Sequence, residues 1–129
     1  MAMDRRRVSS GAPWEAVVGY SRAVRVGAAV SVSGTVGREA DGTVPAGAYA
    51  QAKRALEIVA SALHEVGGGL EHVTRTRIFV TDLGGCFDEV ARAHAEAFSD
   101  IRPATSMVEV SRLVDDAFVV EIEADAVVG

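Results

Sequence analysis

Few side chains in this sequence have the type and spacing needed for acid–base or nucleophilic chemistry. The histidines His64, His72 and His94 share no helical or strand face with carboxylates, so we expect no metal site. Lys53 is the only lysine and lies among polar residues of an expected helix, which makes a Schiff-base amine improbable. Glu121, on an alternating strand near the C-terminus, is the remaining candidate for a general acid or base.

Other reactive groups have simpler interpretations. His94 lies alone on an apolar helix stripe, which is typical of a hydrogen-bonded core histidine. Cys86 precedes a helix but has no base near it, so we expect a bystander thiol, and a single cysteine excludes an internal disulfide. The sequence contains no serine nucleophile elbow, dinucleotide loop or phosphate-loop lysine, so we expect no cofactor.

The stretch "RPATSMVEV", residues 102–110, alternates like a strand entered through a proline. Its pattern places Thr105, Met107 and Glu109 on one face and the intervening small and apolar residues on the other. If the first face lines a pocket, the residue at position 105 decides whether the protein performs chemistry or only binds.

These side chains must be positioned by a sheet and two helices. Residues 1–13 look irregular, and residues 14–129 are expected to form one domain of the α+β class. The expected elements are three short β-rich runs between 16 and 34, a helix at 48–66, a strand at 73–81, a helix at 87–98, a strand through 105 and a strand at 118–128. The order is therefore β-β-β-α-β-α-β-β.

Both helices are predicted to be amphipathic. The apolar stripe of the first comprises Ala52, Leu56, Val59, Leu63 and Val66, and that of the second comprises Phe87, Val90, His94 and Phe98. Because each helix joins two strands, right-handed crossovers place both helices on one face of a mixed β-sheet.

The opposite face of this sheet is expected to be charged. The last strand alternates, with its apolar residues from Phe118 to Ala126 towards the helices and its acidic residues away from them. We expect these side chains to share the second face: Arg75, Arg77, Phe79, Thr105, Met107, Glu121 and Glu123. Apolar residues among such charges favour partial burial by another subunit, so we expect an oligomer.

Composition narrows the class of protein. The chain has 129 residues and a net charge of −5, which disfavours a protein whose main partner is nucleic acid. No apolar run is long enough to span a bilayer, and the N-terminus lacks a signal-peptide core. We expect a cytoplasmic location.

Four blocks carry a resemblance to a known family. "VSVSGTVG", "VTRTRIFVTDL", "RPATSMVEVSRL" and "VVEIEADAVV" occur in the order and spacing of the Rid family, also called YjgF-like or endoribonuclease L-PSP proteins. The chain resembles this family over residues 19–127. The resemblance implies a chorismate-mutase-like α+β subunit and a homotrimer with ligand clefts between its subunits.

The resemblance also implies a chemistry. Active members are deaminases that hydrolyse imines and enamines to ketoacids and ammonia, using an arginine that grips the substrate carboxylate and a glutamate that orients or activates water. Residues of this chain that match the family pocket are Tyr20, Ser33, Gly34 and Glu121. Thr105 replaces the arginine, Met107 a cysteine and Ala91 an asparagine.

The lost arginine leaves several functions open. A threonine hydroxyl cannot supply the charge of a bidentate guanidinium–carboxylate pair, and losing such a contact costs about 2–5 kcal/mol. Arg22 and Arg77 are the candidates to replace it from a neighbouring strand or subunit. The chain is then either a Rid-like hydrolase acting through Glu121 on an altered small metabolite, or a trimer that binds a small molecule without turnover. A ribonuclease is a distant third.

Overall fold

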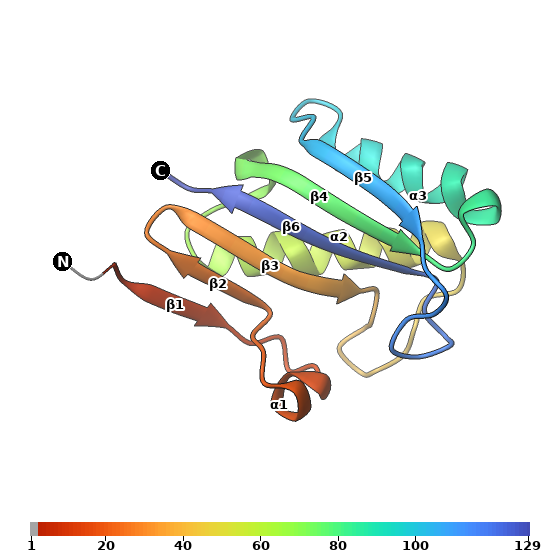
Figure 1. Ribbon diagram of the computed structural model, residues 1–129, viewed down its shortest axis with the longest axis horizontal. Helices are drawn as coiled ribbons and strands as arrows, with labels where there is room; N and C mark the ends of the chain where they lie inside the picture. The colour runs from red at the N-terminus through yellow and green to blue at the C-terminus, as the bar shows by residue number, and fades with distance from the viewer. Residues whose placement is uncertain (1–2) are drawn as a thin grey trace.

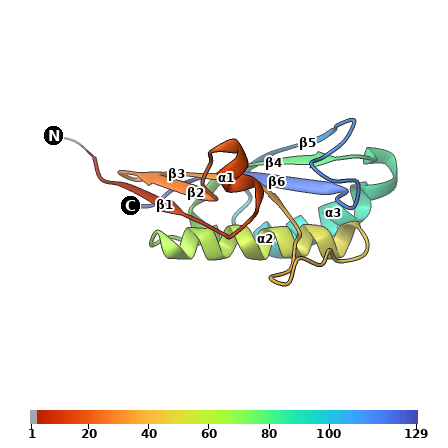
Figure 2. The same ribbon diagram turned by 90° about the horizontal axis from the view of Figure 1, so that it is seen from below.

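A single layer of helices covers one face of a six-stranded sheet (Figures 1 and 2). The computed structural model describes residues 3–129. Its elements in chain order are β1 (Arg5–Val8), α1 (Trp14–Val18), β2 (Ala23–Val26), β3 (Ala29–Val36), α2 (Ala48–Glu65), the 3-10 turn η1 (Leu70–His72), β4 (Val73–Val80), α3 (Leu83–Phe98), β5 (Ala104–Glu109) and β6 (Val120–Val127). None of the described helices is long and apolar enough to cross a membrane.

The sheet has the strand order β1-β2-β3-β6-β4-β5. β4 and β5 are parallel, and the other neighbouring strands are antiparallel. Figure 2 shows α2 and α3 together below the sheet, as the two crossover connections predict. The expected α+β fold with a mixed sheet and both main helices on one face is therefore confirmed.

The core lies between these helices and the sheet. The whole predicted stripe of α2 is buried, and Leu63 and Val59 are fully enclosed. On β6 the residues Val120, Ile122 and Ala124 are also fully buried, so the predicted alternation of this strand is confirmed. Burial of this kind stabilises the fold by roughly 25 cal/mol per Å² of apolar surface removed from water.

The N-terminal region differs from the prediction. Residues 5–8 form strand β1, although residues 1–13 were expected to be irregular, and the first expected β-rich run is instead the single turn of α1. β1 reads RRRV, which carries no apolar alternation, so its strand state comes from antiparallel pairing with β2. α1 ends at Gly19, whose φ of 88° is a left-handed cap conformation.

Helix α3 begins earlier than predicted. Asp82 caps it by accepting a hydrogen bond from the backbone N–H of Gly85 at 3.1 Å, so the helix starts at Leu83 and not at Phe87. Phe87, which was predicted to be buried, is 50% exposed, because the stripe that meets the core comprises Leu83, Cys86, Val90, Ala93 and Ala97. Val90 and Phe98 are buried as predicted.

Candidate functional site

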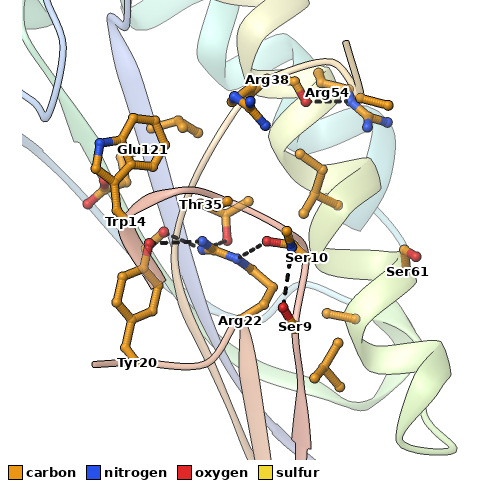
Figure 3. Close-up of a pocket in the computed structure, with 18 of the residues that line it drawn as sticks. Ser9, Ser10, Trp14, Tyr20, Arg22, Thr35, Arg38, Arg54, Ser61 and Glu121 are labelled. Carbon is orange, nitrogen blue, oxygen red and sulfur yellow. Dashed lines mark hydrogen bonds between the residues drawn. The ribbon is translucent and has the colours of Figure 1, made fainter. Parts of the chain in front are cut away.

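A cavity of about 650 Å³ opens where β3 runs on beyond β2. β2 pairs only with the first half of β3, up to Val32, which leaves residues 33–36 without a β2 partner. The segment around α1 folds over this gap, and α2 closes it on the helix side. Its polar and aromatic lining, most of it drawn in Figure 3, includes Ser9, Ser10, Trp14, Tyr20, Arg22, Gly34, Thr35, Arg38, Glu39, Arg54, Ser61, Glu65 and Glu121.

Arg22 forms the structural centre of this cavity wall. Its side chain is buried, and its NH1 donates to the carbonyl oxygen of Gly34 at 2.6 Å and to the hydroxyl of Thr35 at 3.1 Å. Its NH2 donates to the hydroxyl of Tyr20 at 3.2 Å, and its Nε donates to the hydroxyl of Ser10 at 3.2 Å. Arg22 therefore holds Tyr20 and the Gly34 backbone in place, and four of its five N–H groups are already used.

Glu15 supplies the countercharge to this arginine. It is 8% exposed and lies 3.9 Å from the NH2 of Arg22. Its carboxylate accepts hydrogen bonds from the hydroxyl of Ser9 and from both the backbone N–H and the hydroxyl of Ser10. Burial raises the pKa of Glu15, but these hydrogen bonds and the charge of Arg22 outweigh it, so the pKa lies below its ordinary value.

Glu121 lies in the same cavity under opposite conditions. It sits on β6 and is half-buried, and no hydrogen bond or ion pair with another described residue holds its carboxylate. Burial raises the pKa of this carboxyl, the negative charge of Glu123 raises it further, and Arg22 offsets only part of the shift. A carboxyl with a raised pKa that faces a cavity without a partner is suited both to accept and to return a proton.

Gly34 makes room for this carboxylate. A Cβ at this position would lie 2.6 Å from Oε2 of Glu121 and 2.8 Å from its Cδ. Any side chain would therefore push the carboxylate out of its position. The close approach of the Glu121 carboxylate therefore explains why the second residue of the serine–glycine pair is a glycine.

Ser33, the first residue of that pair, points elsewhere. Its hydroxyl donates to the carbonyl oxygen of Ser21 at 2.6 Å, and it does not line the cavity. It fixes the connection between Tyr20 and β2, so its relation to the cavity is indirect.

Thr105 and Met107 lie away from the cavity, which corrects the expected arrangement of the sheet face. The register pairs Thr105 with Thr76 and Met107 with Ile78, and both of these partners are buried on the helix side. Glu121 pairs with Phe79 on the other side. The prediction that Thr105, Met107 and Glu121 share one face is therefore wrong, because the parallel pairing with β4 sets the orientation of β5.

The Thr105 hydroxyl joins a hydrogen-bonded chain. Its Oγ1 lies 2.8 Å from Oγ1 of Thr76, which lies 2.8 Å from Nε2 of His94. Burial lowers the pKa of His94, and its ring packs against Phe98 at a centroid distance of 4.6 Å. The interpretation of His94 as a hydrogen-bonded core histidine is confirmed.

Of the two arginines considered as substitutes, neither has free donors facing the cavity. Arg22 is engaged as described above. Arg77 lies on the outer sheet face, where its NH1 is 3.2 Å from carboxylate oxygens of both Glu123 and Asp125. The predicted side of Arg77 and Glu123 is correct, and the two form an ion pair there.

Sequence reasoning missed part of this site. Ser10, Trp14 and Arg38 line the cavity from segments outside the expected helices and strands, and Glu15 supports this wall by accepting a hydrogen bond from Ser10. The one available signal was Trp14, the only tryptophan of an aromatic-poor chain. Within residues 3–129, no three metal-ligating side chains are close enough together to hold an ion, and burial raises the pKa of the Cys86 thiol.

Comparison with solved structures gives close matches. The crystal structure of Rv2704 from Mycobacterium tuberculosis, a member of the YjgF/YER057c/UK114 family, is 49% identical and has a TM-score of 0.88 over 97% of this chain and 100% of that one. A putative endoribonuclease of Thermotoga maritima is 30% identical, with a TM-score of 0.82 over 95% of this chain and 92% of that one.

Sequence comparison agrees. The mouse protein named 2-iminobutanoate/2-iminopropanoate deaminase is 32% identical over 127 residues, which cover 96% of this chain and 93% of the mouse protein. The profile of the Endoribonuclease L-PSP family matches residues 10–128. With its fold, its profile match and its four sequence blocks in agreement, the chain belongs to the Endoribonuclease L-PSP family, the YjgF-like proteins.

Proposed function

We propose that this protein is a deaminase that hydrolyses the imine or enamine form of a small metabolite. The observation that carries the proposal is Glu121, a half-buried carboxyl with a raised pKa and no partner among the described residues, placed in a cavity beside Gly34. The deaminase name of the mouse relative agrees with that chemistry.

The proposed reaction uses one water and one proton shuttle. Glu121 accepts a proton from water as the water oxygen bonds to the imine carbon, and the C=N double bond becomes a single bond. Glu121 then returns that proton to the nitrogen, which gives a carbinolamine. It next takes the proton of the new hydroxyl and passes it to the nitrogen as the C–N bond breaks, so that a ketone and ammonia leave. A raised pKa suits both steps, because a carboxyl that titrates nearer the working pH serves as base and acid.

Tyr20 and Gly34 position the reacting groups in this scheme. The Tyr20 hydroxyl accepts a hydrogen bond from Arg22, so its own proton is free to be donated to a ligand. The backbone of Gly34 lets Glu121 approach the cavity wall without a clash.

The proposal also includes a homotrimer whose clefts lie between subunits. In one chain, Thr105 lies two strands away from Glu121 and about three residues along the sheet, which is at least about 14 Å. The two residues also point to opposite faces, so they share a small ligand only if β5 of one copy meets the cavity of another. β5 is an edge strand with exposed side chains, including Val108 at 45%.

A second function is a trimer that binds a small metabolite without turning it over. The specific observation in its favour is Thr105, which brings no charge to the position of the family arginine and whose hydroxyl already meets Thr76. A ribonuclease is the least favoured alternative, because the chain carries a net charge of −5.

Ketoacid release from freshly generated imines separates these functions. We expect the wild type to exceed spontaneous hydrolysis, and Glu121→Gln to lower the rate by about 10²-fold or more. Glu71→Gln, at an exposed acidic residue outside the cavity lining, is the matched control and should not change the rate. A wild-type rate equal to the spontaneous one would favour the binding protein.

The assembly is tested by light scattering. At micromolar concentration we expect three times the chain mass of 13.5 kDa. A monomer mass would contradict the proposed clefts between subunits.

A further inference from the structure

Three arginines line the cavity, and two of them are already paired. Arg22 is held by Glu15 and by the hydrogen bonds described above. Arg54, on α2, has its Nε 3.6 Å from a carboxylate oxygen of Glu39 and its NH1 3.4 Å from one of Glu57. Neither guanidinium has its charge available for a ligand.

Arg38 is different. Within residues 3–129, its guanidinium makes no hydrogen bond and no ion pair, although it is half-buried and lines the cavity. In Figure 3 it lies among the labelled residues on the same side of the cavity as Arg54. The charge of Arg38 contributes to the lowered pKa of the exposed Asp41, but the two side chains form no hydrogen bond or ion pair. The half-buried cation therefore has no direct partner, and a bound anion would supply one.

The backbone of Arg38 is fixed, so only its side-chain torsions remain to be ordered when a ligand binds. Its N–H donates to the carbonyl oxygen of Val36 at 3.0 Å, and its own carbonyl oxygen accepts from Nε of Arg54 at 3.1 Å. The preceding Gly37 packs so closely on α2 that a Cβ there would collide with the backbone of Gln51. A pre-positioned group binds with a smaller loss of entropy.

We propose that Arg38 binds the carboxylate of the ligand while the other end of that ligand lies at Glu121. This inference rests on the proposed function and names its substrate class: a monocarboxylic acid longer than a three-carbon ketoacid. The positive charge that Thr105 cannot provide then comes from the cavity wall of the same chain.

Charge and size both favour this class. A guanidinium pairs with a carboxylate through two parallel hydrogen bonds. Glu39, Glu65 and Glu121 line the same cavity and would repel a doubly charged phosphate. The volume of about 650 Å³ is in the range of sites for ligands much larger than pyruvate. Gly34, beside Glu121, and Arg38 are four residues apart, so their α carbons are at most about 14 Å apart.

The test uses Trp14, the single tryptophan, as a reporter, because it lines the cavity. Its fluorescence is titrated with butanoate, hexanoate and octanoate, with the corresponding amides, and with hexyl phosphate. We expect hexanoate and octanoate to bind more tightly than butanoate, than their own amides and than hexyl phosphate. Arg38→Gln should weaken hexanoate binding about 10- to 100-fold and leave hexanamide binding unchanged.

Two further variants sharpen this result. Arg38→Lys keeps the charge but loses the planar fork, so we expect an intermediate affinity for hexanoate. Arg112→Gln removes an arginine that is 77% exposed, outside the cavity lining, and should bind hexanoate like the wild type. Thermal melts check that each variant is folded.

The inference is overturned if the wild type does not bind hexanoate, if Arg38→Gln binds it as the wild type does, or if hexanoate and hexanamide lose equal affinity. Tighter binding of hexyl phosphate would overturn the carboxylate class. Suppose that turnover depends on Glu121 but that carboxylate binding is unchanged in Arg38→Gln. The proposed function would then stand, and only this inference would be removed. Binding that depends on Arg38 without turnover would support the inference and favour the non-catalytic protein.

Discussion

Glu15 and Glu121 are two poorly exposed glutamates near the same arginine, and their surroundings shift their pKa values in opposite directions. Glu15 has the serine hydroxyls, a backbone N–H and Arg22 around its oxygens, so its charged form is stabilised. Glu121 has burial and a like charge, so its charged form is destabilised. The positive charge of Arg22 lies 3.9 Å from the carboxylate of Glu15, which is therefore its counterion.

This difference separates a structural carboxylate from a chemical one. If the Glu15 carboxylate moved away, the buried guanidinium of Arg22 would lose its countercharge. Glu15 therefore has a structural role in the cavity wall. Glu121 gives up stability to keep an unpaired carboxyl in the cavity, which is the usual arrangement where activity and stability conflict. Substitutions of the two glutamates and of their neighbours should separate the structural role of Glu15 from the chemical role of Glu121.

The largest expected effect is on stability, in Glu15→Gln. The substitution leaves the buried Arg22 without its counterion, and breaking a buried pair in this way costs about 3–5 kcal/mol. Because the folded pKa of Glu15 is lowered, its contribution is present above the unfolded pKa and is lost as the pH falls through the folded pKa. Urea unfolding at pH 7 should show the loss, and the difference from wild type should shrink in acid. Equal stability at pH 7 would contradict a structural role.

The next effect is on activity, in Gly34→Ala. The added methyl group must displace the Glu121 carboxylate, and a misplacement of about 1 Å can cost about 10²-fold in rate. Stability should change little, because the clashing atoms are the far end of a flexible side chain. Ketoacid release and a thermal melt measure the two effects. Gly84→Ala, which adds the same methyl group on α3 outside the cavity lining, is the control, and an unchanged rate in Gly34→Ala would show that the position of Glu121 is not critical.

A smaller effect of opposite sign is expected for the stability of Glu121→Gln. Because the folded pKa of Glu121 is raised, the favourable neutral state is fully present below the unfolded pKa, and its benefit is lost as the pH rises through the folded pKa. Glutamine imitates the neutral state at every pH. We expect Tm to rise by about 2–4 °C at pH 7 and not at pH 3, measured by differential scanning calorimetry. A lower Tm at pH 7 would mean that the carboxylate has a stabilising partner.

The smallest expected effect is a shift of the pH profile in Glu123→Gln. The charge of Glu123 helps to raise the pKa of Glu121, so its removal should move the acid limb of kcat/KM towards lower pH. Asp125→Asn is the matched control, since Asp125 pairs with the same Arg77 but does not contribute to the shift. Identical acid limbs in wild type and Glu123→Gln would show that Glu121 is not the group that titrates.

Local patterns in the sequence predicted the centre of the fold. The α2 stripe and the β6 alternation each bury one apolar face against the core. Because a change of register would expose these apolar side chains, the pattern determines the structure. The same patterns and the family blocks selected Tyr20, Gly34 and Glu121, which the structure brings to one cavity.

Only the tertiary structure determined the state and orientation of the edge strands and the pairing of the charged side chains. β1 has no apolar pattern, and β5 is exposed along most of its length, so pairing with β2 and with β4 determined their state and orientation. Whether an arginine is paired likewise depends on how segments are brought together: Arg54 on α2 pairs with Glu39 of the loop before it, and the neighbouring Arg38 forms no hydrogen bond or ion pair with a described side chain. A charge acquires its pKa and its partners from three-dimensional neighbours, and spacing along the sequence does not specify them.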